Sequence, residues 1–278
     1  MGKHSSAIFK GAKYIISNMD YNDEYYKQHP DLHEDDVEWK VEICRSFIDF
    51  VILKNKFEKQ ISILDIGGNG LFLAKISYYI TSKYGIKVNK YSIDLDEKII
   101  VIQRRNNIDI IEASKEDICQ KTHFENKQFD LVLCNDIIEH VIDDRVALKE
   151  LSRISKFVYF KQPLEKALLL TVLNFLTFGY VYKKLETDLG HINRYNRRVF
   201  DLMVNDFFII EKYSFANCFA YLLRKECPSM KATHSIIRIL YSVYSILGLI
   251  LNKTSPELAA YIMSDFYLVI AKSKYEDS

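Results

Sequence analysis

The chain has 278 residues, of which 49% are hydrophobic, and it carries 38 lysines and arginines against 37 aspartates and glutamates. This composition excludes a disordered chain, a collagen and a coiled coil. The formal net charge of +1 gives no general basic field, so nucleic acid is not an expected partner. The length suits one large domain, or one domain with an elaborated cap.

The cysteines are widely separated, odd in number and without a CxxC pair. We therefore expect neither a zinc site nor a disulfide framework, and a reduced, cytoplasmic setting is favoured. Residues 1–13 lack the apolar segment of a secretory signal. The five cysteines are Cys44, Cys119, Cys134, Cys218 and Cys227.

Apolar strands alternate with helices along most of the chain, which predicts an α/β fold whose mostly parallel sheet is covered by helices on both faces. The predicted strands are 61–66, 88–93, 108–111, 129–134, 157–160, 207–210 and 266–270. The predicted helices in the regular part of the chain are 37–53, 71–79, 97–105 and 144–155.

Two apolar stretches interrupt this alternation. Residues 167–182 contain no charged side chain, and residues 235–251 contain only Arg238. Both are shorter than the roughly 18 to 20 apolar residues that a membrane-spanning helix needs. They predict either buried cap or core helices, or a surface that docks on a membrane or admits an apolar substrate.

A glycine turn follows the first strand, in the sequence Leu64-Asp-Ile-Gly-Gly-Asn-Gly70. Glycines there allow positive φ and close approach of a ligand, and the amides that open the next helix point at that ligand. A dinucleotide site would want a third glycine where Leu73 stands. The carboxylate of Asp65 would repel a diphosphate, but it suits the cationic amino-acid end of a sulfonium nucleoside.

The next strands bring further polar residues to the same edge of the sheet. Asp94 ends the second strand, where a carboxylate can accept both ribose hydroxyls. The alternative is an acid that caps the next helix, a task that Asp96 could perform. Asp117 with Ile118 could hold an adenine edge and ring. Asn135 and Asp136 follow the fourth strand into the crevice where open α/β sheets bind ligands.

The segments LDIGGNG, SIDLD, EDI and FDLVLCNDIIEHV, spread over residues 61–162, resemble the class I S-adenosylmethionine-dependent methyltransferases. The resemblance implies a Rossmann-like sheet of seven strands, the last of them, 266–270, antiparallel, and S-adenosylmethionine as cofactor. It implies that Asp94 holds the ribose, with Leu95 beside the adenine. Helical cap insertions would be additions to this fold.

By the same resemblance, further positions contact the cofactor. Asp65, Gly67, Gly68 and Gly70 would surround the methionine part, Asp117 and Ile118 the adenine, and Asn135 and Asp136 the sulfonium end. Trp39, with Lys40, would close the site from a leader helix.

The expected domain organisation follows these motifs. Residues 1–56 would be an N-terminal helical leader or lid, and residues 57–162 the cofactor-binding core. Residues 163–206 would form a cap insertion and a helix. Residues 207–278 would hold the final strands with a helical insertion at 216–264.

Methyl transfer to a hydroxyl or amine needs alignment and a base, and histidine suits that base. His191, in Gly190-His-Ile-Asn-Arg-Tyr195, is one candidate, in an element similar to one of family members acting on sugars, quinols and natural products. His140 is the second, and Tyr195 could orient the acceptor or cap the following helix. No metal is predicted, although the Glu139-His140 pair resembles an element linked to a metal in ubiquinone-pathway O-methyltransferases.

We therefore expect a cytoplasmic methyltransferase acting on a hydroxyl or amine of a small molecule, such as a sugar, a lipid-linked glycan or a secondary metabolite. A hydrophobic acceptor and peripheral contact with a membrane are compatible with the apolar stretches, and the oligomeric state is not predicted. A protein or RNA methyltransferase and a non-catalytic nucleoside-binding scaffold are the open alternatives.

Overall fold

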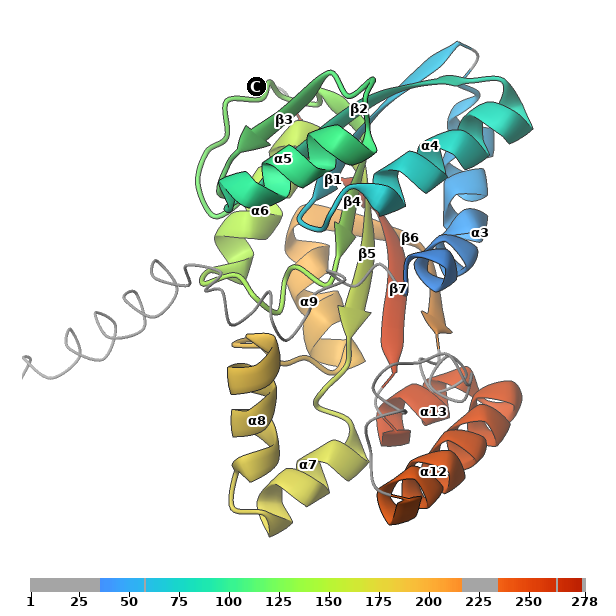
Figure 1. The fold of residues 1–278 in the computed structure, drawn as a ribbon, viewed down its shortest axis with the longest axis vertical. Coiled ribbons are helices and arrows are strands. Elements are labelled where there is room, and N and C mark those ends of the chain that lie inside the picture. The colour runs from blue at the N-terminus through green and yellow to red at the C-terminus, as the bar shows by residue number, and fades with distance from the viewer. Residues whose placement is uncertain (1–35, 58, 217–234, 264, 277–278) are drawn as a thin grey trace, which may run out of the picture.

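The computed structural model describes residues 36–57, 59–216, 235–263 and 265–276 (Figure 1). The first 35 residues of the predicted leader, and Cys218 and Cys227, lie outside these ranges. The strands are β1 (Gln60–Ile66), β2 (Lys87–Asp94), β3 (Glu112–Lys115), β4 (Phe129–Asn135), β5 (Ser155–Pro163), β6 (Phe208–Ala216) and β7 (Phe266–Ser273).

The strands form one seven-stranded sheet in the order β3-β2-β1-β4-β5-β7-β6. The pairs among β1 to β5 are all parallel, whereas β7 runs antiparallel to β5 and to β6. This confirms the predicted mostly parallel sheet with an antiparallel last strand. The order reverses between β1 and β4, and the carboxyl ends of those strands therefore border the crevice where such sheets bind ligands.

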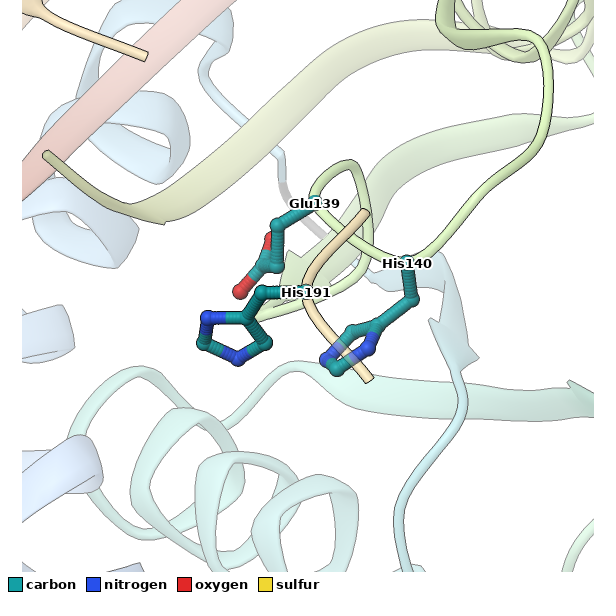
Figure 2. A group of neighbouring side chains, drawn as sticks. All are labelled: Glu139, His140 and His191. Atoms are coloured by element: carbon teal, nitrogen blue, oxygen red, sulfur yellow. The ribbon is translucent and has the colours of Figure 1, made fainter. Parts of the chain in front are cut away.

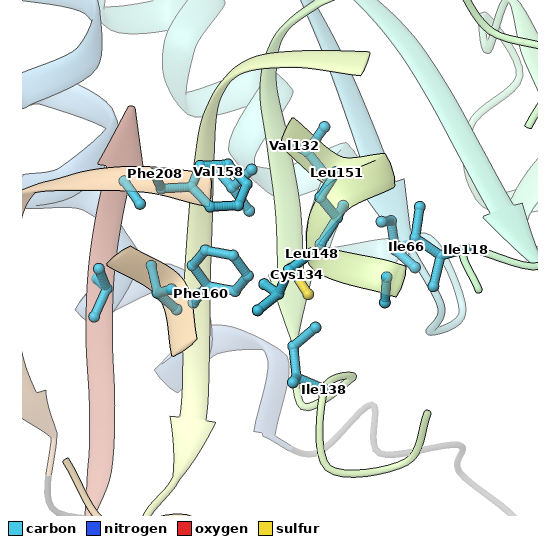
Figure 3. Packing of buried hydrophobic residues seen from close by; sticks show 14 of the residues in the cluster. Ile66, Ile118, Val132, Cys134, Ile138, Leu148, Leu151, Val158, Phe160 and Phe208 are labelled. Atoms are coloured by element: carbon cyan, nitrogen blue, oxygen red, sulfur yellow. The ribbon is translucent and has the colours of Figure 1, made fainter. Parts of the chain in front are cut away.

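Helices cover both faces of the sheet (Figure 1). On β5, Val158 and Phe160 face one hydrophobic cluster while Phe157 and Tyr159 face another, as the two-residue period of a strand requires. The first cluster joins the sheet to α6 and α9, and Figure 3 shows its packing. The second joins the sheet to α3 and α4. The helices are α3 (Val37–Asn55), α4 (Leu71–Tyr84), α5 (Glu97–Asn106), α6 (Asp144–Ile154), α7 (Leu168–Leu176), α8 (Tyr180–Leu189), α9 (Arg197–Phe207), α12 (Ser235–Thr254) and α13 (Pro256–Met263).

The prediction for the third strand was wrong. Residues 108–111 were expected to form it, but the strand is β3, Glu112–Lys115. Ile108 is 95% exposed and lies in the turn after α5, so its apolar side chain indicates no burial. The backbone joins the sheet only where Ile111 donates to the carbonyl of Lys90, and β3 then ends level with Asp94.

The two apolar stretches form helices at one end of the molecule, beyond the sheet (Figure 1). Residues 167–182 do not make a single helix, because the chain turns at Phe178 and Gly179, which both have positive φ. The buried-helix interpretation does not hold for α7, since none of its residues is buried. Within the described ranges, no helix has the length and hydropathy required to cross a bilayer.

Candidate active site

The glycine turn after β1 has a backbone conformation that other residues rarely adopt. Gly67, Gly68 and Gly70 have φ of 73°, 69° and 84°. A Cβ on Gly70 would lie 2.8 Å from Nδ2 of Asn107, and at Gly68 it would meet nothing within 4 Å. Gly70 is therefore fixed by its neighbours in the fold, whereas Gly68 leaves its backbone open to a ligand.

Three side-chain amides near the end of α5 hold the carbonyls of this turn. Gln103 donates to Gly68 over 2.9 Å. Asn106 donates to the carbonyl of Asn69 over 2.9 Å, and Asn107 to that of Gly70 over 2.8 Å. Because these side-chain amides already hydrogen-bond the carbonyls of the turn, its conformation is preorganised before any ligand binds.

Two buried carboxyls flank the turn. Burial raises the pKa of Asp65 well above its usual range, against the opposing charge of Lys40 and with the help of the nearby Asp94. Burial likewise raises the pKa of Asp94 to about 6, opposed by the hydrogen bond from the Asp96 amide. Asp96 caps α5 by accepting from the amide of Lys98, so the capping role falls to Asp96 and not to Asp94. A ligand with donors here would favour the charged form of both acids.

The predicted adenine contacts lie past β2 and β3. Leu95 follows Asp94 and is 53% exposed. Asp117 accepts from the amide of Cys119 over 2.9 Å, which shapes the loop after β3. Ile118 is buried in the core close to Ile66, as Figure 3 shows.

Asn135 ends β4 and Asp136 follows it, in different surroundings. The side-chain oxygen of Asn135 is buried without a hydrogen-bond partner, so it is an acceptor that a ligand could satisfy. Asp136 adopts a left-handed conformation, with φ of 53°. Burial alone would raise the pKa of Asp136, but the charges of Lys161 and Lys40 hold it at about 2. Asp136 is thus an ionised centre that already has two cationic neighbours.

Trp39 lies on α3 and joins this helix to the last strand. Its ring meets that of Phe266 edge-on, with centroids 5.6 Å apart, and is 8% exposed. Lys161 lies 5.5 Å from the Trp39 ring and 3.5 Å from the Phe266 ring. α3 therefore packs against β7 through the rings of Trp39 and Phe266, next to the Lys161 side chain. The predicted contact of Trp39 with a cofactor stays a prediction.

The structure brings the two candidate histidines together (Figure 2). The rings of His140 and His191 meet edge to face with centroids 4.8 Å apart. Glu139 points toward the same space, and the ligating atoms of the three residues lie within 4.8 Å of one another. Glu139 is 1% exposed, and burial with the nearby Asp136 raises its pKa well above the usual range.

The loop of His191 is pinned to the loop after β4. The carbonyl of Glu139 accepts from the amides of Ile192 and Asn193, both over 2.9 Å. His140 Nδ1 donates to the carbonyl of Gly190 over 3.2 Å, which leaves Nε2 as its acceptor nitrogen. His191 Nδ1 is hydrogen-bonded to the buried carboxylate of Glu165. The two imidazoles are therefore fixed in tautomer and orientation.

Comparison with known proteins identifies the domain that contains this site. Residues 64–156 match the family model described as a methyltransferase domain. Over this segment the chain is similar to a methyltransferase domain. The matched segment includes the glycine turn and the loop of His140, whereas Glu165 and His191 lie beyond it. No curated protein sequence matches the chain.

Solved structures similar to this chain share its fold at low sequence identity. A protein from Galdieria sulphuraria, described as a candidate sarcosine dimethylglycine methyltransferase, is 10% identical, with a TM-score of 0.54 and 84% of each chain covered. A candidate methyltransferase in complex with the Haloferax volcanii Trm112 activator is 12% identical, with a TM-score of 0.53 and coverage of 87% of this chain and 98% of that one. Phosphoethanolamine N-methyltransferase 2 from Haemonchus contortus, in complex with S-adenosyl-L-methionine, is 16% identical, with a TM-score of 0.51 and coverage of 81% and 52%.

Tyr195 lies in the core and not in an open site. It is 3% exposed, and its hydroxyl donates to Asp144 over 2.7 Å. It does not cap the next helix either, because Asn196 caps α9. Asp143 caps α6. Asp143 and Asp144, which follow the loop of Glu139 and His140, thus have structural partners.

Sequence reasoning missed several residues that shape the site. Glu165 and Lys161 stand in a segment without a family motif, and Gln103 lies among the charged residues of α5. One signal was present: ionisable residues in or just after a strand that is otherwise apolar are costly to bury, so they need partners. Their partners, however, come from distant parts of the chain.

Proposed function

We propose that this methyltransferase moves a methyl group from S-adenosylmethionine to a hydroxyl or amine of a small molecule, with His191 as the base. The observation that carries the proposal is the hydrogen bond between His191 Nδ1 and the buried Glu165. A carboxylate on one ring nitrogen holds the proton there and leaves the other nitrogen to accept. The acceptor class would be a sugar, a lipid-linked glycan or a secondary metabolite.

The residues around the glycine turn fit S-adenosylmethionine. The buried Asp65 would be stabilised in its charged form by the ammonium of the methionine part, and Asp94 by the ribose hydroxyls. The buried oxygen of Asn135, which has no protein partner, offers an acceptor at the end of β4. When bound, the sulfonium supplies an activated methyl group.

The chain itself then has to align the acceptor and take its proton. Alignment of reacting groups in a fixed site can contribute up to roughly 7 to 11 kcal/mol. His191 is suited to this because Glu165 and the pinned loop fix its ring. His140 lies edge to face with it and could contact the same acceptor.

The test combines cofactor binding with turnover. Calorimetry with S-adenosylhomocysteine measures the cofactor site, and formation of S-adenosylhomocysteine from S-adenosylmethionine with pooled sugar, lipid and small-molecule acceptors measures transfer. His191→Asn is expected to lower turnover about 10²- to 10⁴-fold and to leave the affinity for S-adenosylhomocysteine unchanged. His123→Asn is the control, because His123 is a surface histidine paired with Glu112 and Glu116.

Other outcomes would replace the proposal. Binding without turnover on any acceptor would favour a non-catalytic scaffold, and turnover on protein or RNA alone would favour that substrate class. Activity that EDTA abolishes and a divalent metal restores would assign Glu139, His140 and His191 to a cation. Equal activity of the His191→Asn variant would remove His191 as the base.

A further inference from the structure

We propose that the methyltransferase docks on an anionic membrane through α7, the turn 177–180 and α12, and that its acceptor is presented at that surface. The choice of a membrane-presented acceptor rests on the proposed function, whereas the docking surface stands on separate observations. No residue of α7 is buried, although this helix reads Leu-Leu-Leu-Thr-Val-Leu-Asn-Phe-Leu. Apolar surface of this kind is unusual on a soluble protein and marks an interaction site.

The most prominent part is the turn between α7 and α8. Phe178 is fully exposed, and its neighbours Phe175 and Tyr180 are 80% and 62% exposed. Figure 1 shows the pair of helices extending away from the sheet, with this turn at the far end. A protruding aromatic tip of this shape can enter a lipid headgroup layer without moving the rest of the fold.

α12 adds a second apolar stripe at the same end of the molecule. α13 contacts both α7 and α12, which places these helices together as Figure 1 also shows. The exposed residues of α12 recur at helical spacing, as expected for a helix lying on a surface. They are Ile239, Val243, Ile246, Leu247 and Ile250.

The charges of this end select an anionic bilayer. Around α7 and the first part of α8 the charged side chains are the exposed Lys166, Lys183 and Lys184. The acids of α8, Glu186 and Asp188, lie toward its other end, and Asp188 pairs with Lys184 over 3.7 Å. Between 235 and 255 the charged residues are Arg238 and Lys253. A second copy of the chain would bring these cations against one another in a two-fold contact. Anionic lipid headgroups would instead neutralise them.

The surface is connected to the proposed base. α8 starts at Tyr180, in the aromatic tip, and ends one residue before Gly190 and His191. Ten helical residues span about 15 Å, so α8 bridges that distance between the aromatic tip and the loop that carries the imidazole. An acceptor anchored in the bilayer could therefore extend its polar end toward His191.

Vesicle flotation of the full chain tests the docking surface. We expect the protein to float with vesicles of phosphatidylcholine mixed with phosphatidylglycerol, and much less with phosphatidylcholine alone. The pair of substitutions Phe175→Ser and Phe178→Asn should weaken binding at least about tenfold, because two exposed aromatic rings no longer enter the headgroup layer. Asn tolerates the positive φ at position 178.

Two further variants separate charge from apolar contact. Lys183→Ala and Lys184→Ala together should weaken binding about fivefold per lysine at low salt, and far less at high salt. Ile108→Ser is the control, since Ile108 is 95% exposed between α5 and β3, away from this end. Its vesicle binding should equal that of the unchanged chain.

The results distinguish this inference from the proposed function. Failure to float with anionic vesicles, or unchanged flotation of the Phe175/Phe178 variant, would overturn the docking surface. A dimer in solution that the same variant dissociates would assign the surface to a second copy. Binding of S-adenosylhomocysteine, measured by calorimetry, should be the same in all these variants. Its absence from the unchanged chain would instead remove the cofactor assignment and leave the flotation result standing.

Discussion

Lys161 donates to both carboxylate oxygens of Asp136, over 2.6 Å each. The lysine is 2% exposed on β5, and Asp136 stands in the left-handed turn after β4. Lys40 of α3 completes the group at 3.4 Å from Asp136. Three parts of the chain therefore meet at one partly buried ion-pair centre beside the predicted cofactor site.

Lys161→Met is expected to lower the free energy of unfolding by up to about 3 kcal/mol, because it removes the buried partner of Asp136. The Asp136 side chain is 26% exposed and keeps Lys40 as a second cation. Urea denaturation measures the loss. Lys156→Met on the same strand is the control, since its pair with Asp130 is half-exposed and should contribute about 1 kcal/mol or less. Similar losses of unfolding free energy in both variants would show that the Lys161–Asp136 pair stabilises the fold no more than the exposed pair does.

The same pair predicts a pH dependence. Because the pKa of Asp136 in the folded protein is about 2, below its value in the unfolded chain, ionised Asp136 stabilises the fold above pH of about 4. This contribution should disappear as the pH falls from about 4 to about 2. In the Asp136→Asn variant the acid limb of the stability curve should be flatter, and an unchanged limb would contradict the assignment.

Asp94→Asn should have opposite effects on stability and on cofactor binding. Its pKa is raised to about 6, so the charged carboxylate costs the free protein up to about 3 kcal/mol at pH 7 and about half of that at pH 5. The variant should be more stable in urea by that margin. Its affinity for S-adenosylhomocysteine should fall at least about tenfold. Asp96→Asn, which keeps the cap of α5, is the control for both measurements.

Gly70→Ala tests the turn itself. The positive φ and the contact with Asn107 predict a loss of about 1 to 3 kcal/mol in unfolding free energy and much weaker binding of S-adenosylhomocysteine. Gly85→Ala is matched to it, because Gly85 also has positive φ but a Cβ there would meet nothing within 4 Å. That control should lose about 1 kcal/mol and bind normally. Normal binding by Gly70→Ala would contradict the role of the turn.

Glu165→Gln tests how His191 is positioned. The amide cannot stabilise a charged imidazole as a carboxylate does, so kcat should fall about 10- to 100-fold with little change in the affinity for S-adenosylhomocysteine. Glu165→Asp should recover part of the activity, which a purely structural role would not predict. A loss of affinity for S-adenosylhomocysteine in parallel with the loss of activity would point to a packing defect.

The sequence by itself determined the alternation of strands and helices, the glycine turn and the acids at the ends of β1 and β2. These features are local, since a strand period, a turn residue or a helix cap depends on neighbours in the chain. The third strand was misplaced because Ile108 and Ile111 are apolar but exposed. At the edge of a sheet, pairing with the neighbouring strand and not hydrophobicity decides where a strand begins.

Only the tertiary structure decided which side chains meet. His140 and His191 are 51 positions apart in the sequence, and they adjoin because the carbonyl of Glu139 binds the amides of residues 192 and 193. Tyr195 looked equally available, yet its ring fills the core and its hydroxyl is taken by Asp144. Polar side chains find partners through space, and a linear pattern carries no record of that pairing.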